Sequence, residues 1–390
     1  MPNVLTINSG SSSLKFSVYE MGRSEALLVS GEFKRIGLSH GVFHVEGHNQ
    51  DIDLPNHDAA LRTLFGWLAD YRLGDKLDAV GHRLVYGGPE YYKPQLITPT
   101  LANALKNLIP FAPDHLPEEL RAINVVENVH PGLAQVACFD TAFHWQSPKI
   151  AKLYPLPRHY WDEGLRRYGF HGLSYAYIVQ ELALQDGADD GRVVVAHLGN
   201  GASMAAIRNG CPVDTTMGMT PSGGLMMGTR CGDLDPGAVF FVARKESSLA
   251  TAKVVLNEKA GLLGVSEISS DVEDLIDKQT TDPRAAEAID LFCYQAKKFL
   301  GSMIAVLGGL DKLVFTAGIG EHAPAVRSRI CEGLEFLGIR VDANLNNASA
   351  AVISTEGSRV QVRVMKTNEE IMIARYTNEL LSKGASPIVR

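Results

Sequence analysis

The sequence contains little cysteine, no long apolar run and no excess of basic residues. Its five cysteines are scattered over 390 residues and form no Cys-x-x-Cys pair, which argues against a zinc site or a dithiol redox centre. An odd number of separated thiols is typical of proteins from a reducing compartment, so we expect a cytoplasmic protein. The formal net charge of −7 argues against a broad surface for nucleic acid or membrane, although a few local arginines could still recruit a small anion.

Signals for export or membrane insertion are also lacking. The first residues, Met-Pro-Asn-Val-Leu-Thr-Ile-Asn, have neither the basic nor the apolar region of a signal peptide, and no apolar run approaches the length of a membrane span. With 45% hydrophobic and 21% charged residues, the composition is that of an ordinary globular protein. The length predicts two or three domains with a substantial core.

Two distant parts of the chain share one pattern of elements. Residues 4–19 and 193–208 each read as a buried strand, a turn of small residues and a second strand. In each half a helical pattern then leads to a strand that ends in a polar loop, at residues 120–144 and 285–322. We interpret the repetition as two similar α/β domains with a cleft between them. Unrelated domains with a chance likeness are the alternative.

Prolines recur within residues 148–157, and we take this segment as the boundary between the two domains. The segment from Asn368 to Lys383 has the apolar spacing of an amphipathic helix, and we expect it to return to the first domain. The predicted domains are therefore residues 1–148 with 375–390, and residues 149–374.

A glycine- and methionine-rich segment, Asp214 to Gly237, is the strongest sign of a binding site. It holds six glycines, two prolines and one basic residue, Arg230, and shows neither helical period nor strand alternation. Glycine lets a backbone approach a ligand closely, and a guanidinium group matches the oxygens of a carboxylate or phosphate. We predict an ordered loop over an anion site. A surface loop with a solvated arginine is the alternative.

Smaller patterns also suit an anionic ligand. The turn between Asn8 and Lys15 offers hydroxyls and backbone N–H groups for phosphate oxygens, and residues 198–203 repeat it, although a polar hairpin turn explains each equally well. Arg83 follows a short apolar stretch and precedes two glycines, which suits either an anion or a salt bridge. His171 stands between an aromatic residue and a glycine, and this setting favours ligand contact over the structural role of most histidines.

Carboxylates and glycines follow other predicted strands. Asp140 ends an apolar strand, where it could bind a Mg²⁺-bound water, act as a base or cap a helix. The glycines of residues 318–322 could let a flat nucleotide base lie against the backbone. Glu369 and Glu370 could face the cleft, or simply begin a helix whose dipole favours acids.

In this order, the segments resemble the acetate kinase family, part of the acetate and sugar kinase, Hsp70 and actin superfamily. The resemblance runs from Val4 to about Ile373. The motifs that carry it are Asn8-Ser-Gly-Ser-Ser-Ser-Leu-Lys15, Gly-His-Arg83, Phe-Asp140-Thr-Ala-Phe-His144, Tyr-Gly-Phe-His171-Gly, His197-Leu-Gly-Asn-Gly201, Met-Met-Gly-Thr-Arg230-Cys-Gly, Gly318-Ile-Gly-Glu and Thr-Asn-Glu369-Glu. The family implies two similar actin-like ATPase (ribonuclease H-like) α/β domains with a catalytic cleft between them.

The resemblance also implies an activity. It is the reversible, Mg²⁺-dependent phosphorylation of acetate by ATP through direct in-line transfer, with Mn²⁺ as a possible substitute and a homodimer as the expected assembly. The implied catalytic residues are Asp140, His171 and Arg230; the implied acyl-substrate residues are Arg83, Val85, Phe170 and Pro221; the implied metal ligands are Asn8 and Glu369. The implied nucleotide contacts are Lys15, His197, Leu198, Gly199, Asn200, Gly201, Asp271, Val272, Glu273, Gly318, Ile319, Gly320, Glu321 and His322.

The chemistry of the implied reaction agrees with these residue types. A carboxylate substrate is already ionised at pH 7, so the reaction needs positioning and charge neutralisation more than a strong base. We therefore expect Asp140 to hold a Mg²⁺-bound water or to position a neighbour. Three positions depart from the family pattern: Asp114 replaces a usual leucine, Glu273 an arginine and His322 an asparagine. Because of Asp114, the identity of the acyl group that the enzyme prefers stays open. Because of Glu273, the nucleotide preference also stays open.

Two alternative functions remain open. A propionate or butyrate kinase is the enzymatic alternative, prompted by Asp114. A nucleotide-driven switch or filament module of the same fold is the other. Arg83, His171 and Arg230 argue against the module, because a switch needs no cluster of cations facing a second anion.

Overall fold

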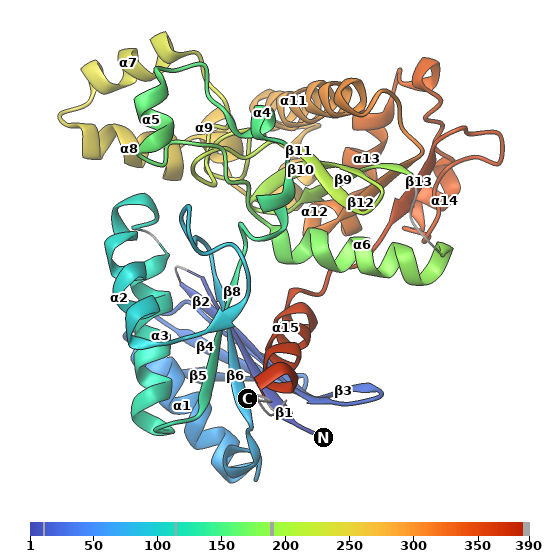
Figure 1. Cartoon of the computed structure of the whole chain (residues 1–390). Coiled ribbons are helices and arrows are strands. Elements are labelled where there is room, and N and C mark those ends of the chain that lie inside the picture. Colours follow the sequence, from blue (N-terminus) through green and yellow to red (C-terminus); the bar gives the residue numbers. More distant parts are fainter. Residues whose placement is uncertain (11, 114, 188–190, 385–390) are drawn as a thin grey trace. The chain divides into compact units, whose positions relative to one another are not determined.

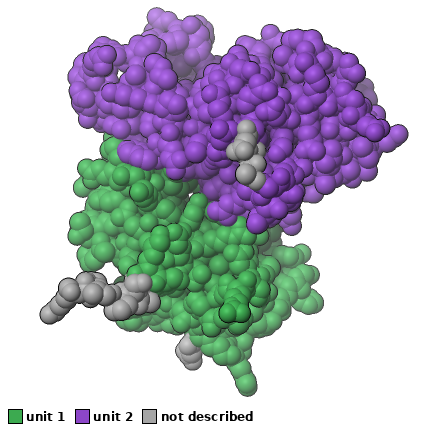
Figure 2. Space-filling view, turned by 45° about the vertical axis from the view of Figure 1, so that its right-hand side comes forward, with its two compact units in different colours: residues 1–142, 368–390 green, residues 143–367 purple. Residues whose placement is uncertain are grey.

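The computed structural model describes residues 1–10, 12–113, 115–187 and 191–384. Ser11 of the predicted phosphate turn and Asp114 of the predicted acyl pocket lie outside the described residues. The chain forms two compact units, residues Met1–Ala142 with Asn368–Arg390 and residues Phe143–Thr367, which Figure 2 distinguishes by colour. The sequence prediction placed the domain boundaries after residues 148 and 374. The chain returns to unit 1 at residue 368, earlier than predicted, because the whole of the last helix packs on the sheet of unit 1.

Unit 1 is built on an eight-stranded sheet in the order β5-β4-β3-β2-β1-β6-β8-β7 (Figure 1). Its strands are β1 (Asn3–Ser9), β2 (Ser13–Met21), β3 (Glu25–Lys34), β4 (Gly41–Val45), β5 (His48–Ile52), β6 (Ala79–Leu84), β7 (Gln95–Leu96) and β8 (Ala134–Phe139). Strands β1, β6 and β8 run parallel to one another. Because the carboxyl ends of parallel strands share one edge, Asn8, Arg83 and Asp140 are brought to the same edge of this sheet.

Helices cover both faces of the unit 1 sheet (Figure 1). They are α1 (His57–Asp70), α2 (Pro99–Asn107), α3 (Leu116–Val129) and α15 (Glu369–Gly384). Apolar residues of α1 and α3, such as Leu64 and Val126, form one core with Phe16 and Phe33 of the sheet. On the other face, α15 packs so closely that a Cβ atom on Gly81 would clash with Ile373. The apolar face of the final helix is therefore buried against the sheet, as its sequence pattern predicts.

Unit 2 contains a five-stranded sheet in the order β11-β10-β9-β12-β13. The strands are β9 (Arg192–Leu198), β10 (Ala202–Arg208), β11 (Cys211–Thr215), β12 (Lys312–Thr316) and β13 (Gln361–Val364). Strands β9 and β10 form the predicted antiparallel hairpin, while β9 and β12 are parallel with Thr316 beside His197. This register brings residues 199–201 and Gly318 to one edge of the sheet.

Some helices of unit 2 flank this sheet, and others, such as α7 (Pro236–Lys245) and α8 (Leu249–Glu258), lie apart from it (Figure 1). The remaining helices of unit 2 are α4 (Lys149–Lys152), α5 (Arg158–Asp162), α6 (Gly172–Asp186), α9 (Gly261–Ser266), α10 (Val272–Lys278), α11 (Pro283–Leu307), α12 (Ala317–His322), α13 (Pro324–Cys331) and α14 (Ala343–Asn347). Helix α6 packs Ile178 and Leu182 against Val193 and Val195, and α11 contacts strands β9, β10 and β11. Among the residues described, we find no helix that is both long and apolar enough to cross a membrane.

The segment after β12 differs from its predicted form. The sequence predicts a turn at residues 318–322, but the structure has the short helix α12 there. The buried guanidinium of Arg327 explains the difference, because its Nη1 donates to the backbone carbonyl oxygens of Gly320 and Glu321 at 2.8 and 3.0 Å. These carbonyls at the end of α12 thus gain a partner from the next helix, α13, beyond the residues of the predicted turn.

Candidate active site

An arginine–carboxylate pair occupies the strand edge of unit 1. Arg83 lies on β6, and Asp140 follows β8, where its backbone N–H donates to the carbonyl oxygen of Leu84 at 2.9 Å. Nε and Nη2 of Arg83 donate to Oδ2 of Asp140 at 3.1 and 2.6 Å. Burial lowers the pKa of Arg83, but the charges of Asp140 and Glu369 raise it by more, so the guanidinium stays protonated. The two predicted site residues are therefore held together as a buried ion pair.

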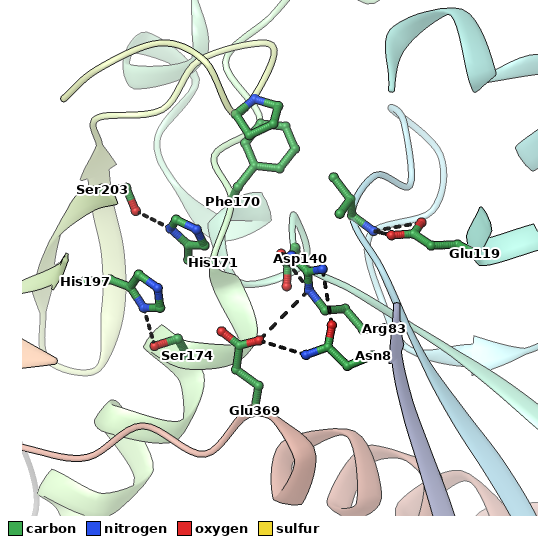
Figure 3. A network of polar contacts seen from close by, with 12 residues as sticks. Asn8, Arg83, Glu119, Asp140, Phe170, His171, Ser174, His197, Ser203 and Glu369 are labelled. Atoms are coloured by element: carbon green, nitrogen blue, oxygen red, sulfur yellow. Dashed lines mark hydrogen bonds and ion pairs between the residues drawn. The ribbon is translucent and has the colours of Figure 1, made fainter. Parts of the chain in front are cut away.

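Two further predicted residues join this pair (Figure 3). The side-chain amide of Asn8 accepts from Nη1 of Arg83 at 3.3 Å and donates to Oε2 of Glu369 at 3.4 Å. Glu369 is the first residue of α15, and Lys15 on β2 pairs with Asn8 in the sheet. Burial and the charge of Asp140 raise the pKa of Glu369 to about 7, against the opposing charge of Arg83.

Oδ1 of Asp140 is a buried polar atom of this cluster that no hydrogen bond satisfies among the residues described. The described residues include no group of three or more His, Cys, Asp or Glu side chains arranged to hold a metal ion. The cluster therefore offers carboxylate and amide oxygens from Asp140, Glu369 and Asn8, but not a complete all-protein metal site.

The sequence reasoning missed Glu119, which lies beside the substrate-binding candidates of unit 1. This residue of α3 is 1% exposed, and its two carboxylate oxygens accept from the backbone N–H of Val85 at 3.1 and 3.2 Å. Burial raises the pKa of Glu119 to about 8, although the charge of Arg83 lowers it. Glu119 falls on the apolar stripe of α3 with Leu116, Leu120 and Ile123. An acid in a buried stripe is the sequence signal that could have revealed it.

In unit 2, two side-chain nitrogens converge on one glycine. A Cβ atom on Gly201 would lie 3.2 Å from Nη2 of Arg230 and 3.4 Å from Nε2 of His171. Nη1 of Arg230 donates to the carbonyl oxygen of Pro221 at 2.6 Å, which holds the guanidinium within its own loop. His171 precedes α6 with a left-handed φ of 56°. The space over Gly201 therefore faces one guanidinium and one imidazole, an arrangement suited to an anion.

The glycine-rich loop that carries Arg230 is ordered by its own backbone, as predicted. The N–H of Met227 bonds the carbonyl of Arg230, and the side chain of Asp233 accepts from the N–H of Gly224 at 2.7 Å. Gly224 has a φ of 86°, and a Cβ atom there would meet the backbone of Thr216. The loop thus needs glycine at this position to fold back on itself.

The predicted nucleotide residues of unit 2 line a cavity of about 530 Å³. Those on its wall are Gly199, Asn200, Asp271, Val272, Glu273, Gly318, Ile319 and His322. Others have packing or hydrogen-bonding roles instead: Leu198 and Gly320 are buried, and Oε1 of Glu321 accepts from the N–H of Ala317 at 2.9 Å. Asp271 also caps α10 by accepting from the N–H of Glu273 at 2.8 Å.

The ring of His197 stacks on that of His171, with centroids 4.1 Å apart and an interplanar angle of 19°.

The predicted apolar wall residues are buried or half-buried: Val85, Phe170 and Pro221. Another cavity of about 280 Å³ lies at α4 and α5 and is lined by Lys149, Tyr154 and Trp161 among others. It contains none of the predicted site residues, so the cavity beside Gly199 is the candidate site.

The two units, with their strand-edge polar residues, define a phosphotransferase with an actin-like ATPase fold. The model of the acetokinase family matches residues 3–375. The acetate kinase of Halothermothrix orenii is 41% identical over 97% of this chain and 99% of its own length, and that of Rhodopseudomonas palustris is 43% identical over 98% and 99%. The chain belongs to the acetokinase family.

Solved structures support the same conclusion. The acetate kinase of Porphyromonas gingivalis superposes with a TM-score of 0.88 at 38% identity, covering 98% of this chain and all of that one. A propionate kinase from Francisella tularensis superposes with a TM-score of 0.91 at 34% identity over 97% of this chain and 100% of its own. The predicted family, the predicted fold and the predicted enzyme class, an acetate kinase, are confirmed.

Proposed function

We propose that this chain catalyses the reversible, Mg²⁺-dependent transfer of the γ-phosphoryl group of ATP to the carboxylate of acetate. The observation that carries the proposal is the pair of side-chain nitrogens of Arg230 and His171 beside Gly201, one residue beyond the wall of the nucleotide cavity. Phosphoryl transfer needs positioned positive charge and N–H donors around the equatorial oxygens more than it needs covalent catalysis. His171 and Arg230 supply such donors.

Unit 1 supplies the acceptor side in this proposal. Arg83 binds the acetate carboxylate, since its guanidinium remains charged and is held at the strand edge by Asp140. Val85 in unit 1, and Phe170 and Pro221 in unit 2, are the apolar residues proposed to contact the methyl group. Acetate is ionised at neutral pH, so its carboxylate needs a positive partner such as Arg83, and no base is required.

The metal is assigned to the oxygens around Arg83. Asn8 and Glu369 are the proposed ligands, and the partnerless Oδ1 of Asp140 fits a metal-bound water. A Mg²⁺ site commonly combines one or two carboxylates with waters and substrate phosphates, so an incomplete set of protein ligands is expected. Mn²⁺ accepts the same oxygen ligands. When bound, the metal neutralises part of the phosphate charge.

The deciding experiment traps acyl phosphate as its hydroxamate. Acetate, propionate and butyrate are each offered with ATP, GTP and pyrophosphate, because Glu273 on the wall of the cavity leaves the donor preference open. We expect the highest kcat/KM with acetate and ATP. Product formation from none of these pairs would instead favour the nucleotide-switch alternative.

Propionate is the second candidate substrate. The close superposition with the Francisella tularensis propionate kinase favours it, and the same hydroxamate series distinguishes the two by kcat/KM. If kcat/KM for propionate exceeds that for acetate, propionate is the preferred substrate and the chain is a propionate kinase. Butyrate should be used least, because its longer chain has to fit beside Val85.

We also propose a homodimer that acts in the cytoplasm, where the reaction has access to ATP. Helix α7 supports the dimer, because none of its residues is buried although it carries Val239, Phe240 and Phe241. Leu249 on the neighbouring helix α8 is 79% exposed. Clustered apolar side chains of this kind mark protein–protein contacts.

A further inference from the structure

A pair of buried hydroxyl groups stands behind His171. Oγ of Ser203, on β10, is 2.8 Å from Nδ1 of His171 (Figure 3) and 2.5 Å from the hydroxyl oxygen of Tyr175. Ser203 and Tyr175 have no exposed surface. His171 and Tyr175 are four residues apart at the start of α6, so their side chains point to the same side and reach one serine.

The protons of these groups can be assigned by counting acceptors. Within the described part of the chain, the hydroxyl of Tyr175 bonds Ser203 and no other group. Burial raises the pKa of Tyr175 well above its usual value, so the phenol keeps its proton. A buried O–H proton without an acceptor bears the full cost of its lost hydration, so Tyr175 has to donate to Ser203.

The proton of Ser203 then has one destination. If Nδ1 of His171 carried a proton, Ser203 would accept from both neighbours, and its own buried proton would have no acceptor among the residues described. When Ser203 donates to Nδ1 instead, the protons of both buried hydroxyl groups have an acceptor. The second arrangement places the imidazole proton on Nε2, the nitrogen that faces the space over Gly201.

We propose that Tyr175 and Ser203 are positioning residues that hold His171 as the tautomer protonated on Nε2. The inference depends on the proposed role of His171 at the phosphoryl group. His171 then presents an N–H donor beside Nη2 of Arg230 without first having to become an imidazolium ion. The donor is ready before the phosphoryl group arrives, so no reorganisation is required during the transfer.

The neighbouring histidine repeats the arrangement. Oγ1 of Thr367 donates to Oγ of Ser174 at 2.8 Å, and Oγ of Ser174 is 2.8 Å from Nδ1 of His197. Because Ser174 already accepts from Thr367, its own proton is directed to Nδ1 of His197. In both stacked rings, Nδ1 therefore accepts a hydrogen bond from a serine hydroxyl, and both rings can be neutral. Two stacked imidazolium ions would repel each other at this distance.

Kinetic tests compare three single variants: Ser203→Ala, Tyr175→Phe and the control Tyr168→Phe. The first two are also combined with His171→Ala. We expect Ser203→Ala to lower kcat about 10- to 100-fold, by analogy with the loss seen when a group that orients a metal-binding histidine is removed. Tyr175→Phe should have a smaller effect, since Ser203 can still donate to Nδ1. The KM values for acetate and ATP should change little. Tyr168→Phe, which removes another buried phenol hydroxyl in unit 2, is the matched control.

The combined variants separate positioning from general damage. In the His171→Ala background, neither Ser203→Ala nor Tyr175→Phe should lower kcat further, because both act through the missing imidazole. An equal loss of kcat in both backgrounds would overturn the proposal. If His171→Ala itself keeps the wild-type kcat, the proposed role of His171 fails, and the tautomer is then decided by the spectrum alone.

The spectrum is a ¹⁵N NMR measurement on the full chain labelled at histidine, with His171 assigned from the signals lost in His171→Ala. In the wild type we expect a protonated Nε2 and an unprotonated Nδ1. In Ser203→Ala we expect the two tautomers to mix. A proton on Nδ1 of His171 in the wild type would contradict the proposal directly.

Discussion

At the scale of single residues, the site is a set of charges whose neighbours fix their positions. Arg230 is held by the carbonyl of Pro221, and Arg83 by the carboxylate of Asp140. Neither arginine has to find its geometry when a ligand arrives, because most of the conformational freedom of the side chain is already lost in folding. Such fixed charges contribute more to a transition state than mobile surface cations.

Arg230→Ala should lower kcat by about 10³-fold or more, because it removes a positive group from the transferring phosphoryl. The hydroxamate assay at saturating acetate and ATP measures the effect. Arg208→Ala, which removes an arginine that bonds the carbonyl of Leu307, is the control and should keep kcat close to the wild-type value. A loss of less than ten-fold in Arg230→Ala would remove Arg230 from the catalytic set.

Asp140→Asn tests whether the buried carboxylate acts through charge. The substitution keeps the shape of the side chain but removes the negative charge that pairs with Arg83 at 2.6 Å and that the partnerless Oδ1 shares. We expect kcat to fall about 10²-fold or more and the Mg²⁺ concentration for half-maximal rate to rise. Near-normal turnover with an unchanged Mg²⁺ dependence would show that Asp140 neither serves the metal nor positions Arg83.

At the scale of elements, local patterns predicted more than distant contacts did. The hairpins β1–β2 and β9–β10 and the helix α11 were predictable because strand alternation, small-residue turns and helical period are all local. The helix α12 was mistaken for a turn because its last carbonyls are bound by a side chain of the next helix, Arg327, which lies beyond the predicted turn. Glu119 was missed because it acts on a residue from another element. Ser203 was assigned to the phosphate turn of residues 198–203, and its contact with His171 of another element was not predicted.

Helix α3 makes the stability of the chain depend on pH through Glu119. The carboxyl group keeps its proton to about pH 8 in the fold, whereas in an unfolded chain it ionises near 4.5. Its contribution to the free energy of unfolding is therefore fully present below pH 4.5, falls as the pH rises to about 8 and is constant above. The charged groups that face it are Arg83, which opposes the shift, and Asp140, which increases it.

Glu119→Gln removes this titration while keeping an oxygen for the N–H of Val85. We expect the free energy of unfolding of the wild type, minus that of the variant, to decrease steadily between about pH 5 and pH 8, by at most about 1.4 kcal/mol per unit. Urea unfolding at a series of pH values measures the difference. A difference that stays flat across this range would mean that Glu119 is ionised in the fold.

At the scale of the whole molecule, the apolar surface of α7 predicts the assembly. This helix has no buried residue, and its two adjacent phenylalanines, Phe240 and Phe241, are 66% and 56% exposed. An isologous contact between two copies would bury them, since the same patch on each copy faces its equivalent. We expect the wild type to sediment at about twice the chain mass of 42.3 kDa.

Replacing both Phe240 and Phe241 by Asp should give a folded monomer, because the like charges would face each other across the twofold axis. Sedimentation velocity over a range of protein concentrations measures the change, and circular dichroism checks the fold. Leu184→Asp, at an exposed apolar residue of α6, is the control and should remain dimeric. A double variant that still sediments as a dimer would place the contact elsewhere on the surface, and a monomeric wild type would refute the dimer altogether.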